Sequence, residues 1–291
     1  MKMRFTKMHG IGNDYVYVNC MDQALPHPEK ISQYISHRRF SIGSDGLICI
    51  CPSEIADFRM RMFNADASEG KMCGNGTRCI AKYVYDKGLT KNTSITLETL
   101  SGIKKIDMTL GEDGLVAAAT VDMGEPIIAT KKIPMICDKP TFIDGVISLP
   151  QNIQQKIRGT AVSMGNPHFV IFVDDVDNFD VEGIGRQIEK HPLFPEQTNT
   201  EFVQVLDKNS VKFRVWERGS GETWACGTGA CAVAFTAINL GKAGHKGEFL
   251  NVHAKGGDLR VMHDTNNHMI LQGPAVTAFE GEIEIPDELV K

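Results

Sequence analysis

The hydrophobic and polar positions of this chain follow two periods, and the shorter, strand-like period predominates. Residues 58–63 alternate Met60 and Met62 with Arg59 and Arg61, a pattern typical of a strand with one buried and one solvated face. Similar short runs, rich in β-branched and aromatic residues and bounded by turn residues, recur along the chain. Strands are expected at 4–8, 15–19, 47–51, 94–99, 104–110, 115–123, 161–163, 169–173, 202–206, 212–216, 249–254, 259–263 and 268–271.

Helical periodicity is confined to four segments. Residues 28–38 and 181–190 predict short amphipathic helices, and residues 73–87 predict a longer one that stops before a glycine. The fourth segment, ACAVAFTAI at 230–238, is apolar on all sides, so we expect it to be enclosed by other structure. Strands outnumber helices and cluster instead of alternating with them, which predicts an α+β fold.

Two of the helices follow turns of nearly the same sequence. Residues 64–79 read NADASEGKMCGNGTRC and residues 217–232 read ERGSGETWACGTGACA, which places Cys73 and Cys226 at an offset of 226 − 73 = 153. The same offset relates Gly12-Asn13 to Gly165-Asn166, Arg61 to Arg214, Glu69 to Glu222 and Gly88 to Gly241. A constant offset without a gap predicts a duplicated domain.

We therefore expect two pseudo-symmetric domains, each a mostly antiparallel β-sheet curled round a central buried helix. The first should comprise residues 1–123, joined by a C-terminal strand within 274–291, and the second residues 124–273. Prolines at 126, 134 and 140 make the 124–149 segment irregular or an edge strand, and we place the crossing between the halves there. A chain of 291 residues is long enough for two such domains.

Composition and charge exclude several classes of function. The content of 42% hydrophobic and 23% charged residues is ordinary for a globular protein. A net charge of −5 gives no overall basic field, so nucleic acid is not expected as a partner. The start has no apolar signal segment and no run of 18 apolar residues occurs, so we expect neither secretion nor a membrane span but a cytoplasmic protein.

The eight cysteines show no pairing pattern that predicts a metal site. There is no Cys-x-x-Cys and no zinc-type arrangement with histidine, and in a reducing compartment most cysteines are small core residues. Cys79 and Cys231, inside their helices, are expected in the core. Cys73 and Cys226 differ, because a cysteine directly before a helix sits where the helix terminus stabilises its thiolate and lowers its pKa.

The doubled turn predicts acid/base chemistry at a carbon next to a carboxylate. Helix starts at 74–76 and 227–229 present unpaired N–H groups and the positive end of the helix dipole, which suits a carboxylate and an enolate-like charge developing on it. Inverting a stereocentre needs a base on one face and an acid on the other. A thiolate and a thiol, Cys73 and Cys226, meet that need from two sides without pyridoxal phosphate or a nicotinamide cofactor.

The chain resembles the diaminopimelate epimerase family from Lys7 to about Gly273. The resemblance rests on MHGIGNDYV, FNADASEGKMCGNGTR, SMGNPHFV, FPEQTN and ERGSGETWACGTGACA. It implies a cofactor-independent isomerase that interconverts LL- and meso-diaminopimelate in lysine and peptidoglycan synthesis. It also implies Cys73 and Cys226 as the acid/base pair, a fold of two pseudo-symmetric domains and a homodimer.

The resemblance also implies a set of substrate-binding residues. Gly74, Asn75, Gly227 and Thr228 would hold the carboxylate at the reacting centre. The rest of the substrate would be bound by Asn13, Asn64, Asn166, Asn199, Glu217 and Arg218. His168 either orients a catalytic group or serves as a satisfied packing residue.

One position departs from the family pattern. Where many members carry a glutamine in the turn after the first helix, this chain has Gly46, so any contact from that side chain is absent. At the offset of 153, Gly46 corresponds to Asn199, and the first-half Asn64-Ala65 corresponds to Glu217-Arg218.

Other functions remain open at this level. GTGACA fits a Gly-x-Gly-x-x-Ala dinucleotide motif, although a loop, residues 217–226, separates it from the preceding strand. A proline-racemase-like enzyme or a carbon-bond isomerase of the same fold is a second alternative. A non-catalytic amino acid-binding protein is the third.

Overall fold

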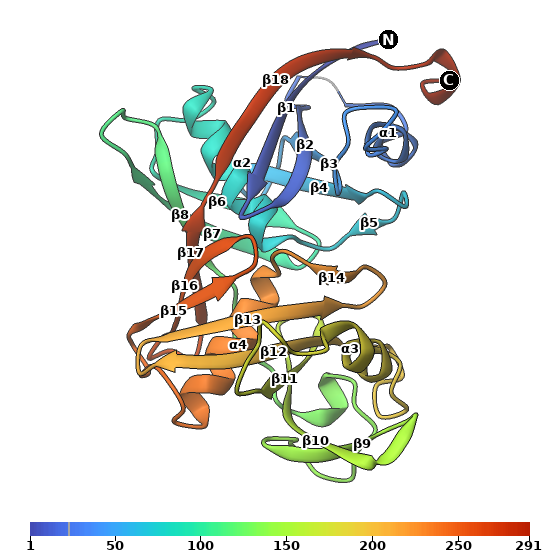
Figure 1. The fold of residues 1–291 in the computed structure, drawn as a ribbon. Coiled ribbons are helices and arrows are strands. Elements are labelled where there is room, and N and C mark those ends of the chain that lie inside the picture. Colours follow the sequence, from blue (N-terminus) through green and yellow to red (C-terminus); the bar gives the residue numbers. More distant parts are fainter. Residues whose placement is uncertain (23) are drawn as a thin grey trace. The chain divides into compact units, whose positions relative to one another are not determined.

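The protein forms two compact units in a computed structural model that describes residues 1–22 and 24–291. One unit contains residues 1–121 and 272–291, and the other contains residues 122–271 (Figure 1). Each unit contains strands that pair predominantly antiparallel, with some parallel pairs, and two α-helices. The α+β fold class predicted from the sequence is confirmed.

The first unit begins and ends with paired strands. Its elements are β1 (Lys2–Gly10), β2 (Asn13–Asn19), α1 (Pro28–Ile35), β3 (Gly46–Cys51), β4 (Phe58–Asn64), β5 (Glu69–Gly70), α2 (Gly74–Asp86), β6 (Ser94–Thr99), β7 (Gly102–Leu110), β8 (Val116–Asp122) and β18 (Val276–Glu284). Antiparallel pairs predominate, and only two pairs within this unit's described strands are parallel. The parallel pair β2–β3 is connected through α1, and the parallel pair β4–β6 is connected through α2.

The second unit repeats this plan. Its elements are the 3-10 turn Thr130–Lys132, β9 (Gly145–Leu149), β10 (Asn152–Ser163), β11 (Pro167–Phe172), α3 (Val181–Glu189), β12 (Asn199–Asp207), β13 (Ser210–Glu217), β14 (Gly221–Thr223), α4 (Gly227–Asn239), β15 (Phe249–Ala254), β16 (Gly257–His263) and β17 (Met269–Pro274). Here the parallel pairs are β11–β12, connected through α3, and β13–β15, connected through α4. The two units therefore share the order of strands, helices and parallel crossings, as the offset of 153 predicts.

The helices α2 and α4 are the central helices of their units. Each has 13 residues and joins two parallel strands of its sheet. In α4 the buried residues are Gly227, Gly229, Ala230, Cys231, Ala232, Val233, Ala234, Phe235, Thr236 and Ala237. The only hydroxyl in its central run is satisfied, because Thr236 Oγ1 donates to Ala232 O at 2.8 Å. The prediction that this apolar helix is enclosed by structure is confirmed.

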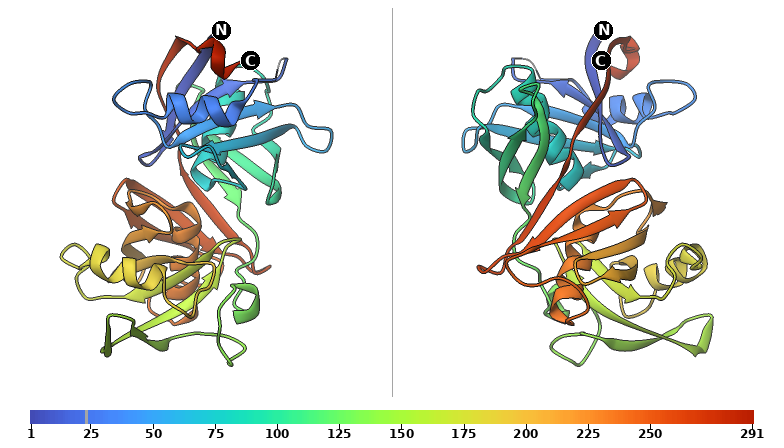
Figure 2. Two further views of the ribbon diagram at one scale, coloured as in Figure 1. Left: turned by 90° about the vertical axis from the view of Figure 1, so that its right-hand side faces the viewer. Right: turned by 60° about the vertical axis from the view of Figure 1, so that its left-hand side comes forward.

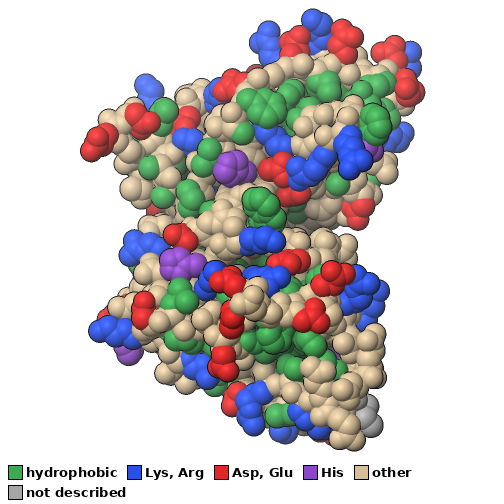
Figure 3. Space-filling model, viewed as in Figure 1, with side chains coloured by type: hydrophobic (Ala, Val, Ile, Leu, Met, Phe, Trp, Pro, Cys, Tyr) green, Lys and Arg blue, Asp and Glu red, His purple; other side chains and the backbone are tan. Residues whose placement is uncertain are grey.

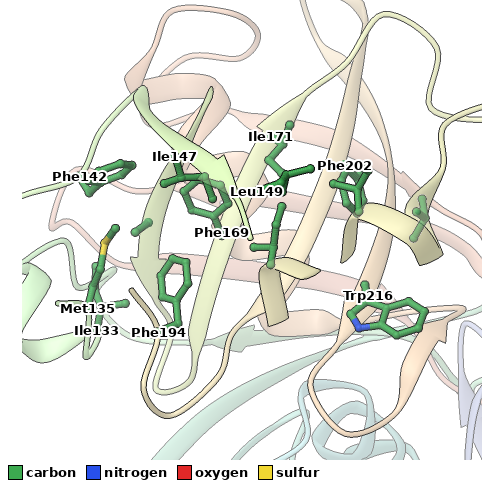
Figure 4. Close-up of a cluster of buried hydrophobic side chains, with 14 of the residues drawn as sticks. Ile133, Met135, Phe142, Ile147, Leu149, Phe169, Ile171, Phe194, Phe202 and Trp216 are labelled. Carbon is green, nitrogen blue, oxygen red and sulfur yellow. The ribbon is translucent and has the colours of Figure 1, made fainter. Parts of the chain in front are cut away.

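Aromatic and aliphatic side chains fill the core of the second unit between α3 and the sheet (Figure 4). Phe169 and Phe194 pack with ring centroids 5.6 Å apart, and Phe179 packs against Phe202 at 4.8 Å. Trp216 closes one end of this cluster and donates its indole N–H to Glu189 Oε2 at 2.7 Å. Each such buried side chain contributes about 1.5–3 kcal/mol relative to an exposed one.

The C-terminal strand completes the first unit. β18 is antiparallel to β1 with Lys2 opposite Glu284, and the terminal ammonium of Met1 donates to Ile285 O at 2.8 Å. Ile285 is 2% exposed in a core formed by β1, β2, α1, β3 and β4. Both ends of the chain consequently lie in this unit, as Figures 1 and 2 show.

The structure differs from the sequence expectation between residues 145 and 160. β9 and the first half of β10 form an antiparallel hairpin there, whereas the sequence predicted a strand only from residue 161. Residues 154–156 and Arg158 are exposed, so this part of β10 is held by main-chain pairing and carries no burial pattern that a sequence can reveal.

Acidic and basic side chains are interspersed over the face of both units in Figure 3. Within the described residues, no helix is both long and apolar enough to cross a bilayer.

Candidate active site

A cysteine caps the N-terminus of each central helix in the same geometry. Cys73 precedes α2 with φ −131° and ψ 117°, and Cys226 precedes α4 with φ −127° and ψ 109°. Each sulfur accepts a hydrogen bond from the third residue of its helix, at 3.3 Å from Gly76 N and 3.3 Å from Gly229 N. A thiol therefore occupies the place of a helix-capping hydroxyl, beside the free N–H groups of the first turn.

Glycine is required where each sulfur approaches its helix. A Cβ added to Gly229 would lie 3.2 Å from Cys226 Sγ and 2.8 Å from Glu201 Oε1. A Cβ added to Gly76 would lie 3.3 Å from Cys73 Cβ. The Gly-x-Gly step thus gives the thiol room to fold back over the helix start.

Matching ion pairs brace the turns that lead to the two cysteines. Arg61 Nε contacts Glu69 Oε1 at 2.9 Å across β4 and β5, and Arg214 Nε contacts Glu222 Oε1 at 2.7 Å across β13 and β14. Both pairs are related by the offset of 153. The sequence identified these four residues as part of the repeat but not as ion pairs.

Neutral amides and one arginine surround Cys73. Its thiol donates to Asn13 Oδ1 at 3.3 Å, and Asn75 Nδ2 donates to the same oxygen at 3.3 Å. Arg78 is completely buried, and its guanidinium donates to Asn75 Oδ1 at 2.8 Å and to Gly74 O at 3.1 Å. The structure thus groups the predicted residues Asn13, Gly74 and Asn75 around the first thiol.

Asn13 is hydrogen-bonded to a network of charged side chains formed by Asp45, Arg38 and Asp14. Asn13 Nδ2 donates to Asp45 Oδ2 at 2.8 Å, and Arg38 donates to Asp45 at 2.8 Å and to Asp14 at 2.6 Å. Burial and the adjacent Asp14 carboxylate raise the pKa of Asp45. Burial opposes ionisation of Asp14 as well, but hydrogen bonds from Arg38 and Lys7 outweigh it and lower the Asp14 pKa.

The surroundings of Cys226 are acidic where those of Cys73 are not. Thr228 Oγ1 lies 3.4 Å from Cys226 Sγ and accepts from Asn166 Nδ2 at 3.3 Å. Asn166 Oδ1 in turn lies 3.1 Å from Nε2 of the fully buried His168. His168 Nδ1 contacts Glu201 Oε1 at 2.6 Å, so the histidine that the sequence left ambiguous is hydrogen-bonded on both nitrogens.

The Glu217-Arg218 pair lies at the end of β13. Thr223 Oγ1 donates to the Glu217 carboxyl, and burial raises the pKa of that group. Arg218 N donates to Asn199 Oδ1 at 3.0 Å, and Asn199 Nδ2 donates to Pro167 O at 3.0 Å. Asn199 is 2% exposed, so its amide holds β11 and the Glu217-Arg218 step together within this unit.

Asn64 and Gly46 occupy facing positions in the first unit. Asn64 accepts from Tyr15 Oη at 3.4 Å and donates to Ser68 Oγ at 3.0 Å, while Gly46 pairs with Asn64 across β3 and β4. A Cβ added to Gly46 would lie 2.1 Å from Phe63 O and 2.8 Å from Tyr15 Cε1. The glycine therefore does more than omit a contact, because this backbone leaves no room for a side chain.

Burial raises the pKa of both thiols, contrary to the sequence expectation that the helix terminus lowers one of them. For Cys73, burial outweighs the N–H groups of Gly76 and Asn75 and raises its pKa to about 11. Burial likewise raises the pKa of Cys226 well above its usual value, and the negative charges of Glu217 and Glu201 add to the effect. The helix donors act in the predicted direction, but desolvation is larger.

Sequence reasoning missed two buried charged residues, Arg78 and Glu201, and the partly exposed Asp45. The strand pattern contained no signal for Glu201, because β12 opens with the polar run Asn-Thr-Glu and the whole run is buried. Arg78 falls on a helix face that an amphipathic pattern would assign to the core. The other described cysteines are free thiols, and Cys79 and Cys231 are fully buried as predicted.

No group of three or more potential ligand side chains for a metal ion occurs within residues 1–22 and 24–291.

The sequence is similar to a large family of isomerases. The sequence model of the family described as "Diaminopimelate epimerase" matches residues 5–129 and 160–278. The diaminopimelate epimerase of Methanococcus maripaludis is 50% identical over 284 residues, covering 97% of this chain and 100% of that protein. That of Acetivibrio thermocellus is 49% identical over 284 residues, covering 97% and 99% of the two chains.

Solved structures show the same fold at lower identity. A hydroxyproline epimerase from Agrobacterium vitis, with bound trans-4-hydroxy-L-proline, has a TM-score of 0.74 and 14% identity. The comparison covers 99% of this chain and 94% of that one. It supports the fold alone.

Proposed function

The chain belongs to the diaminopimelate epimerase family, and from this premise we propose that it interconverts LL- and meso-diaminopimelate by a two-base mechanism without a cofactor. It is an isomerase with the diaminopimelate epimerase activity of its relatives. The observation that carries the mechanism is the pair of cysteine caps, because one protein places the same thiol at two equivalent helix starts.

The proposed chemistry is an exchange of the substrate's α-proton. One thiolate removes the proton from the α-carbon, and the thiol of the other cysteine gives a proton to the opposite face of the same carbon. The sulfur that loses its proton becomes the base for the reverse direction. Because the free thiols have raised pKa values, the α-ammonium group of the bound substrate supplies the positive charge that favours the thiolate.

The carboxylate on the reacting carbon belongs at the helix starts. Gly74 and Asn75 in α2, and Gly227 and Thr228 in α4, lie in the first turns, where backbone N–H groups are free to donate. The same donors stabilise the enolate-like charge that develops on the carboxylate when the α-proton leaves. Stabilisation of this intermediate is what makes a weakly acidic C–H group reactive.

Recognition of the distal, unreactive end is assigned to the residues that differ between the halves. At the offset of 153, Asn64 in the first unit corresponds to Glu217 in the second. Arg218 directly follows Glu217. An acid and an arginine match the ammonium and carboxylate of the distal amino acid group. Asn13, Asn166 and Asn199 complete the proposed set, with Asn199 acting through its hold on the Arg218 backbone.

A homodimer is proposed as the working form. The family resemblance supports it, and so does β18, where Val276 and Phe279 are 40% and 49% exposed on a terminal strand. Equilibrium sedimentation that finds only monomer at micromolar concentration would refute this assignment.

Deuterium exchange tests the proposed reaction directly. Purified protein is incubated with LL-diaminopimelate in D2O without added cofactor, and the α-carbon is followed by NMR. We expect deuterium at that carbon together with formation of the meso isomer. Proline in place of diaminopimelate is the matched substrate control, and exchange into proline alone would identify a proline-racemase-like enzyme instead.

Substitution of either cysteine tests the two-base assignment. Cys73→Ala and Cys226→Ala should each lower kcat by about 10³-fold or more, because each removes an acid/base group. The affinity for diaminopimelate, measured by calorimetry, should change much less. Cys231→Ala, a buried cysteine one turn into α4, is the control for general damage to the helix. Full activity in either Cys73→Ala or Cys226→Ala contradicts the mechanism.

A further inference from the structure

The carboxyl group of Glu201 is fully buried in the second unit, two positions along β12 from the predicted binding residue Asn199. Glu201 on β12 and His168 on β11 are both 0% exposed, and Glu201 Oε1 lies 2.6 Å from His168 Nδ1. The other carboxyl oxygen, Oε2, has no hydrogen-bond partner within the described residues. A carboxyl group in such a place is costly to bury, so its presence requires an explanation.

The fold itself does not need this pair. At the offset of 153, Glu201 corresponds to Ile48 and His168 corresponds to Tyr15 in the first unit. Ile48 is completely buried at the equivalent place on β3. Since the same architecture accepts an apolar side chain there, the carboxyl group of Glu201 is not required to complete the sheet.

The contacts beyond His168 define the direction of a hydrogen-bond chain. Asn166 donates through Nδ2 to Thr228, so it is its Oδ1 that faces His168, and Nε2 of His168 must carry the proton between them. Thr228 Oγ1 accepts from Asn166, which leaves its own hydrogen for Cys226 Sγ at 3.4 Å. From His168 Nε2 onward, every donor in the chain therefore points toward the sulfur.

The equivalent amide in the first unit is turned the other way. Asn13 donates through Nδ2 to Asp45, away from the thiol, and presents Oδ1 to Cys73 at 3.3 Å. The two pseudo-equivalent asparagines thus offer an acceptor toward Cys73 and a donor toward the residue that contacts Cys226. In each unit a buried or half-buried carboxyl group lies at the far end of the network.

We propose that Glu201 is a positioning residue that holds His168 with its Nε2–H toward Asn166, and so anchors a one-way chain of donors that ends at Cys226. The proposal rests on the proposed function for the role of Cys226. Through this chain Glu201 keeps the Thr228 hydroxyl donating to Cys226 Sγ, whereas its own negative charge acts the other way and disfavours the thiolate.

Two uncharged variants of similar size separate the effect of the hydrogen bond between residue 201 and His168 from the effect of the negative charge of Glu201. Glu201→Gln and Glu201→Met both remove the carboxyl group, but only Gln can donate to His168 Nδ1 and keep the proton on Nε2. The remaining titratable neighbours of Cys226, namely Glu217 on β13 and His168 on β11, are common to both variants. Any difference between the variants therefore reports the anchoring bond.

The measurement is the pH dependence of alkylation of each cysteine by iodoacetamide, read by peptide mass spectrometry. At a fixed pH below the midpoint, Cys226 should react about tenfold more slowly in Glu201→Met than in Glu201→Gln, because the thiolate loses a donor. Cys73, in the other unit, should react equally in both. Equal Cys226 profiles, or parallel changes at both cysteines, overturn the proposal.

A measurement on the unsubstituted protein keeps the proposal testable if Glu201→Met does not fold. With 15N-labelled histidine, the Nε2 of His168 should carry a proton throughout the pH range in which the protein stays folded. A bare Nε2 overturns the proposal. Neither measurement involves turnover, so a failure of deuterium exchange, which concerns the proposed function, is distinguished from a failure here.

Discussion

The two cysteines have matching backbone geometry but different electrostatic neighbours. Arg78 is buried near Cys73 and its positive charge lowers the Cys73 pKa, although burial prevails. The offset of 153 replaces this arginine with Cys231 in the second unit. Cys226 instead faces Glu217 and Glu201, which raise its pKa further. A symmetric pair of caps thus holds two thiols of unequal acidity.

This inequality predicts that Cys73 ionises first in the substrate-free protein. Cys73 should become reactive toward iodoacetamide with a midpoint near its pKa of about 11, and Cys226 only at higher pH. Because burial raises both pKa values above those in the unfolded chain, the stabilising contribution of the neutral thiols is present below the unfolded pKa of about 8.5 and lost as pH rises above it.

Alkylation and unfolding measured between pH 7 and 11 check both statements. Arg78→Met, which removes the positive charge near Cys73, should delay the reaction of Cys73 without accelerating that of Cys226. Modification of Cys226 before Cys73 would contradict the assignment.

At the scale of the element, the first turn of each central helix is shaped by the glycine that receives the sulfur. A methyl group at Gly76 would meet the movable ends of Ile48 and Met60, at 2.7 and 2.8 Å. At Gly229 it would meet Glu201 Oε1 at 2.8 Å and Cys226 Sγ at 3.2 Å. A glycine-to-alanine substitution therefore disturbs hydrophobic packing at the start of α2. At the start of α4 it disturbs the Cys226 thiol and the Glu201 carboxyl group.

We predict that Gly229→Ala lowers kcat by about 10²-fold, since a displacement of the thiol by a fraction of an ångström to 1 Å misaligns proton transfer. Gly76→Ala should cost less, because the Ile48 and Met60 side chains can move. Steady-state kinetics of the two variants, with circular dichroism to confirm folding, provide the comparison. A larger loss of kcat in Gly76→Ala than in Gly229→Ala would contradict this reading.

The sequence predicted elements well where local signals agree and poorly where distant contacts decide. The central helices were predicted because a glycine-rich turn precedes each one and Gly88 or Gly241 follows it. The outer half of β10 was missed because its residues 154–156 are exposed and only the pairing with β9 holds them.

Within the candidate site, local motifs identified the residues but not how they are held. The cysteines and the glycines that follow them lie in one repeated turn, so the sequence alone identified them. Glu201 contacts His168 across 33 residues and Asn13 contacts Asp45 across 32, and no local pattern reports such pairs. The raised pKa values of the thiols also depend on burial by the folded unit, which a motif does not contain.

At the scale of the whole molecule, the first unit is built from both ends of the chain. β18 pairs along β1, and Ile285 enters a core whose other buried members come from the first 63 positions. The second unit is continuous, from 122 to 271. Contacts made by residues 276–285 therefore stabilise the first unit.

Ile285→Ala tests this division. Loss of a buried isoleucine side chain should destabilise the first unit by about 2–5 kcal/mol. Hydrogen exchange followed by mass spectrometry should show reduced protection in β1, β2 and β3, with α4 and its neighbouring strands unchanged. Thr277→Ala, at an exposed position of the same strand, is the control and should have little effect. Equal loss of protection in both units would contradict the division.

The pairing of β1 with β18 also has a consequence for synthesis on the ribosome. Residues 122–271 emerge as one uninterrupted block and have all their own strands before translation ends. The first unit is made earlier but lacks its edge strand and Ile285 until residues 276–285 are synthesised. The half of the protein that is translated first is consequently the last to become complete, and until then its β1 edge is exposed to chaperones and to other nascent chains.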